Sequence, residues 1–435
     1  MEVIVRLDRC GMVVCVALVL AACSGGEDPV KVGTDDPSTA TAGPTFAQDV
    51  LPMLADNCTR CHGASALASL DFTDPAVASA WAPAMVQRIQ SGEMPPPAPD
   101  PDCHPYRGSE HLQLDPALEP LLIEWIDAGT PIGDLASAPA IEPWVPTALS
   151  RRDLELRPPA DYVPQFVDAN EYRCFLVDDV EAATWVTGIE ALVDNATISH
   201  HAVLFVDPDA GSEANVQDPA TRSWSCPEVL PEDNWQFLNA WAPSGEAVEF
   251  PAGMGMKLEA GSQLVLQMHY FTSGGEPPAD RPGYGLMLAD EVEDELFYLA
   301  LGPESFRIPA GDASFTETLE LPMEYLTYGG FSLDVYGLMP HMHVLGASYD
   351  FTTTSPGGEE SCISRADDYD FSMQPTWWFD EPVRIGASDL LTVSCTWDNS
   401  ATNPRQLSDP PQDVTWGENT QEEMCYALMY AAIRY

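Results

Sequence analysis

The sequence predicts a multidomain protein in which a small all-α domain precedes two all-β domains of the jelly-roll-like sandwich type. Its 435 residues are enough for two to four domains. Helix-like segments occur between residues 44 and 135, and short β-like runs separated by turn residues follow them. The 40 prolines and 30 glycines also favour turn-rich β structure over long helices.

The chain is strongly acidic. Its 18 basic and 68 acidic residues give a net charge of −50 at pH 7. This balance argues against nucleic acid or an anionic membrane surface as a partner, because both repel negative charge. Solubility is the simplest explanation of the charge, and a cationic partner stays open.

Residues 1–22 have the form of an export signal rather than of a folded element. Arg6 and Arg9 precede an apolar run that is too short to span a membrane. The run ends in Leu-Ala-Ala-Cys, which is similar to a bacterial lipoprotein signal cleaved before Cys23. This resemblance implies an exported lipoprotein that is lipidated on Cys23. Ser24 resembles the pattern for outer-membrane sorting, so we expect an anchor in the outer membrane, at its periplasmic face or on the cell surface.

Residues 23–43 are rich in Gly, Ser, Thr, Pro and Asp, which is typical of a flexible linker. Export would place the chain in a compartment that permits disulfides. Of the eleven cysteines, Cys10 and Cys15 would leave with the signal and Cys23 would carry the lipid, so eight remain for other roles.

The predicted α-helical domain, residues 44–135, contains the sequence Cys-Thr-Arg-Cys-His at 58–62. A Cys-x-x-Cys-His motif is typical of c-type haem attachment. Cys58 and Cys61 would form the two thioether bonds, and His62 would bind the haem iron. A redox or zinc-binding cysteine pair that happens to precede a histidine is the alternative.

A methionine loop and a helix accompany the haem motif. Met94, in Gly-Glu-Met-Pro-Pro-Pro, is predicted as the second iron ligand, and Met85 is the alternative. A helix predicted at 118–128 ends before a Gly-Thr-Pro stop. The haem motif, the Met-Pro-Pro loop and the Trp-Ile-Asp-Ala-Gly sequence at 125–129 together resemble a small cytochrome c domain. That resemblance implies one haem c and a redox partner that donates electrons to it.

A Pro/Ala-rich link, residues 136–160, separates the helical domain from two predicted β domains, residues 161–302 and 303–435. The β domains are predicted from short runs of apolar and β-branched residues between Gly, Pro, Asp and Asn. Such runs occur at 172–177, 202–206, 263–268 and 391–394.

Five of the eight histidines lie on or beside these apolar runs. His341 and His343 are separated by one residue, so on a strand both imidazoles face the same side, as a pair of metal ligands would. His200 and His201 are adjacent and would bind one metal only where the strand is bulged or ends. His269 stands alone. Five such histidines without a metal would each need buried polar partners, so the pattern favours metal binding.

The histidine spacing resembles that of the copper type II ascorbate-dependent monooxygenases, the family of peptidylglycine α-hydroxylating and dopamine β-monooxygenases. The resemblance implies two copper ions on two consecutive β-sandwich domains. The first copper would be bound by His200, His201 and His269. The second, catalytic copper would be bound by His341, His343 and Met424.

The same resemblance implies a disulfide beside Met424, because the methionine ligand of the family is followed directly by a disulfide cysteine. Cys425 follows Met424, and Cys395 would be its partner. Cys174 and Cys226, which bracket the His-His pair, are predicted as a second disulfide. The cysteines left without an assigned partner are Cys103 and Cys362.

The ligand sets agree with copper. Imidazoles and a thioether form a neutral set, and the soft thioether favours Cu(I). Non-haem iron oxygenases use two histidines and a carboxylate, and no matching acidic residue stands out in this sequence. A blue copper site needs a cysteine thiolate, whereas Cys425 is expected to be oxidised in a disulfide. Zinc on three histidines is the alternative at the first site, but zinc does not explain Met424.

The resemblance also implies a reaction. The first copper would store and pass one electron, and the second would bind O2 and hydroxylate a C–H bond of a small-molecule substrate, with ascorbate or another external reductant. Gln267 matches a family residue between the two sites. Met339 stands where the peptide-hydroxylating enzymes have an arginine for the peptide carboxylate, and Tyr426 and Leu428 replace two further residues of those enzymes. We therefore expect a neutral or apolar, non-peptide substrate.

The haem motif adds an expected electron source, because a haem fused to the copper domains would deliver electrons to the first copper. The alternative function is a surface-anchored copper-binding or electron-transfer protein without oxygenase activity, which would use the same ligands.

Overall fold

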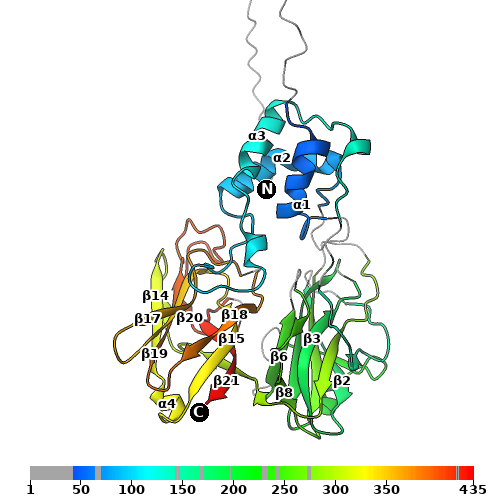
Figure 1. Ribbon diagram of the computed structural model, residues 1–435. Coiled ribbons are helices and arrows are strands. Elements are labelled where there is room, and N and C mark those ends of the chain that lie inside the picture. Colours follow the sequence, from blue (N-terminus) through cyan, green and yellow to red (C-terminus); the bar gives the residue numbers. More distant parts are fainter. Residues whose placement is uncertain are drawn as a thin grey trace, which may run out of the picture. The chain divides into compact units, whose positions relative to one another are not determined.

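The computed structural model (Figure 1) describes most of the chain after residue 42. The described residues are 43–63, 70–142, 145, 147–165, 170–195, 197–227, 234–241, 245–271, 276–371, 373–417, 419 and 421–435. The predicted export signal, Cys23 and all but the last residue of the predicted linker lie outside them. Residues 43–435 form one unit by their contacts. Within the described ranges, no helix is long and apolar enough to cross a membrane.

The helices lie mainly at the start of the described chain. They are η2 (Phe46–Val50), α1 (Leu51–Asn57), α2 (Pro75–Gln90), η3 (Ser109–Leu112), α3 (Leu118–Asp127) and η4 (Leu135–Ser137). Helix α2 begins after Asp74, whose carboxylate accepts hydrogen bonds from the backbone N–H groups of Ala76 and Val77. The helix predicted at 118–128 is confirmed as α3. A cytochrome c fold is not evident from these short helices, so that assignment stays a prediction.

The first β domain consists of two sheets. One has the strand order β1 (Leu154–Leu156), β10 (Gly283–Ala289), β3 (Thr184–Leu192), β8 (Met254–Leu258), β11 (Asp294–Glu295), with β7 (Val248–Glu249) also paired to β3. The other has the order β5 (Ser223–Ser225), β2 (Asn170–Asp179), β9 (Gln263–Phe271), β4 (Ser199–Asp207), β6 (Gln236–Trp241). Helix η5 (Ser212–Asn215) follows β4. Apart from the parallel pair β8–β11, neighbouring strands are antiparallel.

Strand β9 shows how side-chain alternation builds this domain. Leu264, Leu266 and Met268 belong to the apolar core between the two sheets. Successive side chains of a strand point to opposite faces, so Gln267 and His269 lie on the outer face of the five-stranded sheet. On that outer face Val265 belongs to a second apolar cluster, and Gln267 and His269 are buried polar residues at a candidate site.

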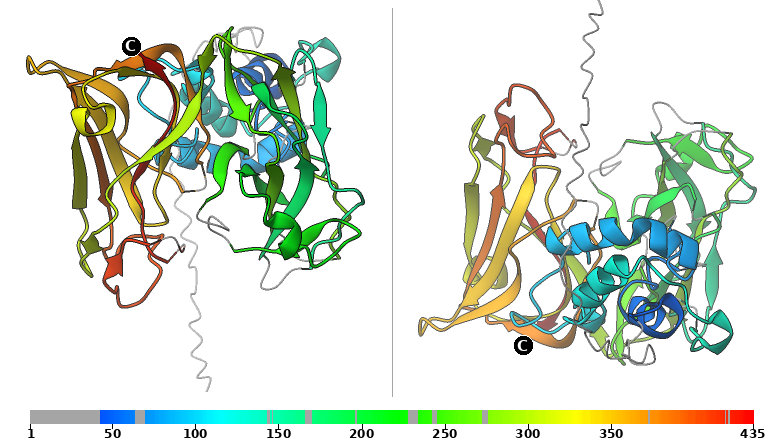
Figure 2. Two further views of the ribbon diagram at one scale, coloured as in Figure 1. Left: turned by 90° about the horizontal axis from the view of Figure 1, so that it is seen from below. Right: turned by 90° about the horizontal axis from the view of Figure 1, so that it is seen from above.

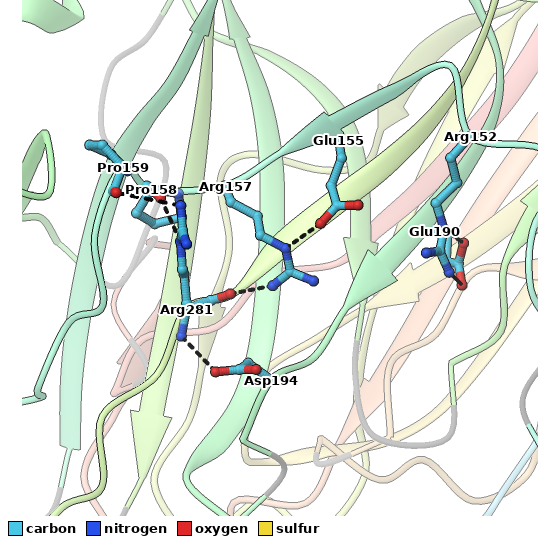
Figure 3. Close-up of polar contacts among 8 residues, drawn as sticks. All are labelled: Arg152, Glu155, Arg157, Pro158, Pro159, Glu190, Asp194 and Arg281. Carbon is cyan, nitrogen blue, oxygen red and sulfur yellow. Dashed lines mark hydrogen bonds and ion pairs between the residues drawn. The ribbon is translucent and has the colours of Figure 1, made fainter.

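Residues of the predicted link 136–160 take part in this first sandwich. Strand β1 pairs with β10, and arginines around it bind the sheet (Figure 3). The Arg152 guanidinium forms two hydrogen bonds with the Glu190 carboxylate, at 2.7 and 2.8 Å. Arg281 Nε donates to the Pro158 carbonyl oxygen at 3.0 Å.

The second β domain also pairs two sheets around an apolar core. One sheet has the order β12 (Phe297–Leu301), β21 (Tyr426–Arg434), β15 (Ser332–His341), β18 (Trp377–Ile385), and the other has the order β14 (Phe315–Pro322), β19 (Leu390–Trp397), β16 (Gly346–Thr354), β17 (Glu360–Ala366). The short pair β13 (Arg307–Ile308) and β20 (Val414–Thr415) and helix α4 (Glu324–Thr327) complete it. Figure 2 shows the strands of each sandwich as two layers. The described part of the chain is thus mostly β, as expected, and compatible with two sandwich domains.

A third disulfide, between Cys103 and Cys362, joins the loop after α2 to strand β17. The same loop places Tyr106, which is 2% exposed, in the core of the second sandwich. Arg107 N donates to the Trp378 carbonyl oxygen at 2.8 Å. The two cysteines that the sequence left without partners are therefore paired with each other.

Candidate metal centres

The first centre lies on two neighbouring strands of the first sandwich. His200 and His201 are on β4, and His269 is on β9, opposite His201. The β4–β9 register shifts between Ser199 and His201, which is the irregularity expected for two adjacent histidines that turn toward one metal. The structure thus meets the condition under which two adjacent histidines can share one metal.

The three imidazoles of the first centre converge through their Nδ1 atoms. His201 Nδ1 lies 3.3 Å from His200 Nδ1 and 3.4 Å from His269 Nδ1. One ring nitrogen from each histidine falls within a 4.8 Å cluster, and no other group of three or more His, Cys, Asp or Glu in the described part of the chain does so. The arrangement is that of a three-nitrogen metal site.

Burial keeps these imidazoles neutral, which metal binding requires. Desolvation, with smaller effects of the neighbouring imidazoles, lowers the pKa of His201 to about 3. Desolvation and the charge of His200 likewise lower the pKa of His269 to about 3. The lone pairs needed for a metal are therefore available at neutral pH without loss of protons from the two rings.

Neighbouring side chains hold His269 in place. Its Nε2 is 2.8 Å from Asn170 Oδ1, and because an amide oxygen only accepts, Nε2 carries the proton and Nδ1 is left with a lone pair. The Tyr172 ring stacks on His269 at 4.2 Å with an interplanar angle of 9°. Gln267 donates from Nε2 to the Pro227 carbonyl oxygen at 2.9 Å.

The predicted disulfide between Cys174 and Cys226 is confirmed. Cys174 lies opposite Gln267 in the β2–β9 pair, and therefore on the same face of the sheet as His269.

The second centre lies at the end of β15. The rings of His341 and His343 are 5.2 Å apart and nearly perpendicular. His341 Nδ1 lies 2.7 Å from Gln374 Oε1, and His343 Nδ1 lies 3.0 Å from the Glu422 carbonyl oxygen. Both acceptors require a protonated Nδ1, so both rings present Nε2 as the metal-binding atom.

The chain between the two histidines is also held firmly. The Tyr369 hydroxyl accepts from Met342 N at 3.0 Å and donates to the Met342 carbonyl oxygen at 2.8 Å. Burial, followed by the charge of His343, lowers the pKa of His341 to about 4. The His341 imidazole is therefore neutral at pH 7, and hydrogen bonds at Nδ1 fix the orientation of both rings.

The β15–β21 pairing brings the tail of the chain to the second centre. His341 lies opposite Tyr426 in the last pair of this register. Just before Tyr426, the Glu422 carbonyl oxygen and the Glu423 carboxylate contact His343, so this segment carries Met424 to the same end of the sheet. The predicted disulfide between Cys395 and Cys425 is confirmed. The structure thus brings all three predicted ligands of the second centre to the same end of the sheet.

One face of this sheet extends from the second centre as an apolar surface. Opposite residues of an antiparallel pair share a face, so Tyr426 lies beside His341, and Leu428 beside Met339. The Tyr426 hydroxyl donates to Glu304 Oε1 at 3.1 Å. Met339, at the position where the peptide-hydroxylating enzymes have an arginine, is therefore part of a row of apolar side chains.

Sequence reasoning missed the residues that support the ligands. Asn170 and Gln374 carry no local signal, because each contacts its histidine only through the folded sheets. Glu423 does have a local signal, because it is an acidic residue directly before Met424 and a disulfide cysteine. Its side chain is fully buried, and burial raises its pKa to about 7, although the N–H groups of Leu345 and His343 oppose the rise.

The predicted haem-binding residues lie together after α1. Cys58 and Cys61 lie outside the three disulfides of the described chain. His62 N donates to the Cys58 carbonyl oxygen at 2.8 Å, and the His62 ring stacks on Phe72 at 4.6 Å. His62 Nδ1 is buried with no hydrogen-bond partner in the structure. Haem attachment at these three residues stays a prediction.

The two candidate methionines differ in environment. Met85, on α2, is buried in the same apolar cluster against which Cys58 packs. Met94 is 38% exposed and precedes Pro95 in a loop. The assignment of Met94 as the second iron ligand stays a prediction, with Met85 as the alternative.

Two comparisons with known proteins bear on the copper sites. Residues 308–433, which contain His341, His343 and Met424, match the family described as copper type II ascorbate-dependent monooxygenase, C-terminal domain. Over 260 residues, 54% of this chain, the sequence is 25% identical to the Homo sapiens protein named "Putative DBH-like monooxygenase protein 2". The match covers 47% of that protein, so the chain spans about half its length. Both findings support the copper type II monooxygenase family.

Solved structures resemble the chain only weakly. The infectious bursal disease virus VP2 subviral particle matches with a TM-score of 0.17 and 10% identity, over 67% of this chain and 75% of that one. PNGF-II matches with a TM-score of 0.24 and 6% identity, over 65% of each chain.

The contact between Asn170 and His269 makes a testable prediction for the first centre. Asn170→Leu removes the acceptor that fixes the His269 ring, so we expect copper affinity at this centre to fall about 10- to 100-fold. Titration against a copper chelator in a His343→Ala background, which leaves the first centre to bind the metal, measures the change. An affinity equal to that of His343→Ala alone would contradict the role of Asn170.

Proposed function

We propose that this chain is a copper-dependent monooxygenase that hydroxylates a C–H bond of a small, non-peptide substrate with O2. The observation that carries the proposal is the second centre: the family match at 308–433 contains His341, His343 and Met424, and the β15–β21 register brings them to one end of the sheet. Neutral imidazoles with a thioether and no carboxylate suit copper.

The proposal assigns a role to each candidate ligand. His200, His201 and His269 would hold the first copper through Nδ1, and His341, His343 and Met424 would hold the second through Nε2 and sulfur. When bound, the two copper ions would supply one-electron chemistry and the activation of O2. The chain contributes orientation: Gln374 and the Glu422 carbonyl fix the rings at the second centre, and Asn170 fixes His269 at the first.

The substrate would lie on the apolar face beside His341. Met339 and Leu428 are adjacent there, and Tyr426 offers a hydroxyl that Glu304 holds. Transfer of apolar surface from water favours binding to such a face, whereas a peptide carboxylate would find no guanidinium at Met339. This supports a neutral or apolar substrate.

We further propose that Cys58, Cys61 and His62 hold one haem c, with Met94 or Met85 as the other iron ligand. The haem would supply electrons for the first copper in place of, or in addition to, ascorbate or another external reductant, and would receive them from a redox partner. The Cys-x-x-Cys-His motif and the buried His62 Nδ1, which has no hydrogen-bond partner in the structure, support this part of the proposal.

The oxygenase activity makes the second prediction. Full-length protein supplied with copper, reductant and a panel of neutral substrates should place one 18O atom from 18O2 in a product, detected by mass spectrometry. His341→Ala should abolish the product because it removes a ligand of the second centre. His111→Ala, an exposed histidine beside Glu110, should retain it. Full copper loading with electron transfer but no labelled product would instead favour the copper-binding, electron-transfer function.

Haem content makes the third prediction. Expressed in a host that attaches c-type haem, the chain should carry one covalently bound haem, and Cys58→Ser with Cys61→Ser should lose it, as shown by the haem stain of a denaturing gel. Met94→Leu should change the reduced absorption spectrum if Met94 binds iron, and Met85→Leu should do so if Met85 does. Zinc bound to wild-type protein in place of haem would refute the haem assignment.

The export proposal makes the fourth prediction. We propose that Cys23 carries a lipid that anchors the chain in the outer membrane. Cys23→Ala should move the protein from the outer-membrane fraction to the soluble fraction and abolish labelling by a radioactive fatty acid. Unchanged fractionation of the variant would count against a lipid anchor.

A further inference from the structure

Glu423 is a fully buried carboxylate that lies directly before Met424. An acidic group removed from water is costly unless hydrogen bonds replace its hydration. A buried residue of this type next to a predicted ligand therefore needs a structural or functional reason.

Three N–H donors surround the carboxylate. Oε2 accepts from His343 N at 2.9 Å and from Trp397 Nε1 at 2.8 Å, and Oε1 accepts from Leu345 N at 2.7 Å. An acceptor with two oxygens satisfies all three, whereas an amide would turn an NH2 group toward one or more of these donors. The environment therefore selects a carboxylate rather than any polar side chain.

The donors connect three segments that are far apart in the sequence. His343 and Leu345 belong to the turn after β15, and Trp397, fully buried, ends β19 beside Cys395. The backbone of Glu423 is held in turn by Thr415, whose carbonyl oxygen accepts from Glu423 N at 3.0 Å. The side chain of Glu423 thus connects the turn at residues 343–345 to the segment that carries Met424.

The same segment also fixes the orientation of the His343 ring. Glu422, the residue before Glu423, supplies the carbonyl oxygen that His343 Nδ1 contacts at 3.0 Å. The Glu423 carboxylate fixes the His343 backbone N–H, and the Glu422 carbonyl fixes the ring of the same residue. If the carboxylate is lost, both His343 and Met424 are free to shift relative to each other.

We propose that Glu423 is a positioning residue of the second centre. Its carboxylate joins residues 343–345 and Trp397 to the segment that carries Met424, and so sets the distance and orientation between His343 and Met424. This inference rests on the proposed function, because it assumes that these two residues bind the same metal. It concerns hydrogen bonds to backbone and indole N–H groups and assigns Glu423 no contact with the metal.

Glu423→Gln tests the proposal, and Asp334→Asn provides the matched control. Asp334 is also a buried carboxylate on the second sandwich, where it pairs with Arg384 and Arg434. It lies on β15 seven residues before His341, roughly 23 Å away at about 3.3 Å per residue. Both substitutions remove a buried charge from the same domain, but only Glu423 contacts a residue of the second centre.

The measurement is copper affinity at the second centre, by chelator competition at pH 8 in full-length protein with a His269→Ala background. Glu423→Gln should weaken binding about 10- to 100-fold and alter the Cu(II) electron paramagnetic resonance spectrum. Asp334→Asn should lower the thermal midpoint while leaving affinity and spectrum unchanged. Equal affinities for Glu423→Gln and the background protein, or equal losses in Glu423→Gln and Asp334→Asn, would overturn the positioning role.

A second variant covers the case in which Glu423→Gln does not fold. Glu423→Asp keeps both oxygens and the charge but shortens the reach by one carbon, so it should fold and bind copper less tightly than the background protein. Unchanged affinity and spectrum in folded Glu423→Asp would overturn the proposal. A background protein that binds no copper at the second centre would instead overturn the proposed function, which separates the two failures.

Discussion

The antiparallel pairing of β15 with β21 is the interaction on which the candidate catalytic site depends. It places the last strand of the chain between β12 and β15, and its register sets His341 opposite Tyr426. The side-chain period of a strand is two, so a slip of one residue would turn the apolar side chains of β21 away from the face that carries His341. Candidate ligands that are distant in the sequence lie at the same end of the sheet because this register is held.

A second common feature is the fixed orientation of the imidazoles. At the first centre, Nε2 of His269 contacts Asn170, and Nδ1 faces the other rings. At the second centre, Nδ1 of His341 and of His343 is hydrogen-bonded, which leaves Nε2 available to a metal. The two candidate centres therefore present opposite ring nitrogens. Each choice is determined by the acceptor that the surrounding sheet brings to the ring, as expected where outer hydrogen bonds set the tautomer of a ligand.

Disulfides reinforce these arrangements at the points where strands alone would leave freedom. The Cys174–Cys226 bridge lies on the face that carries His269, and the Cys395–Cys425 bridge holds the residue after Met424 to β19. The Cys103–Cys362 bridge attaches the loop after α2 to β17, across a sequence separation of 259 residues. Cross-links of this kind restrict the unfolded chain and, in the folded state, limit how far a ligand-bearing segment can move.

The sequence by itself determined which residues are candidates for the chemistry. The His-x-His and His-His pairs and the Cys-x-x-Cys-His motif are local patterns, and spacing on a strand or loop is enough to single them out. The distant residues His269 and Met424 and the Cys395–Cys425 disulfide were predicted from the family resemblance. The cytochrome c assignment rests on the same kind of local motif and stays a prediction.

Only the tertiary structure decided how those residues are supported. The partner of Cys103, the contacts of Asn170 and Gln374 with their histidines, and the three donors around Glu423 all join segments that are distant in the chain. Their physical reason is the pairing register and the packing of two sheets, which depend on every strand at once. Local sequence patterns contain no information about which N–H group will face a given carboxylate after the sheets have formed.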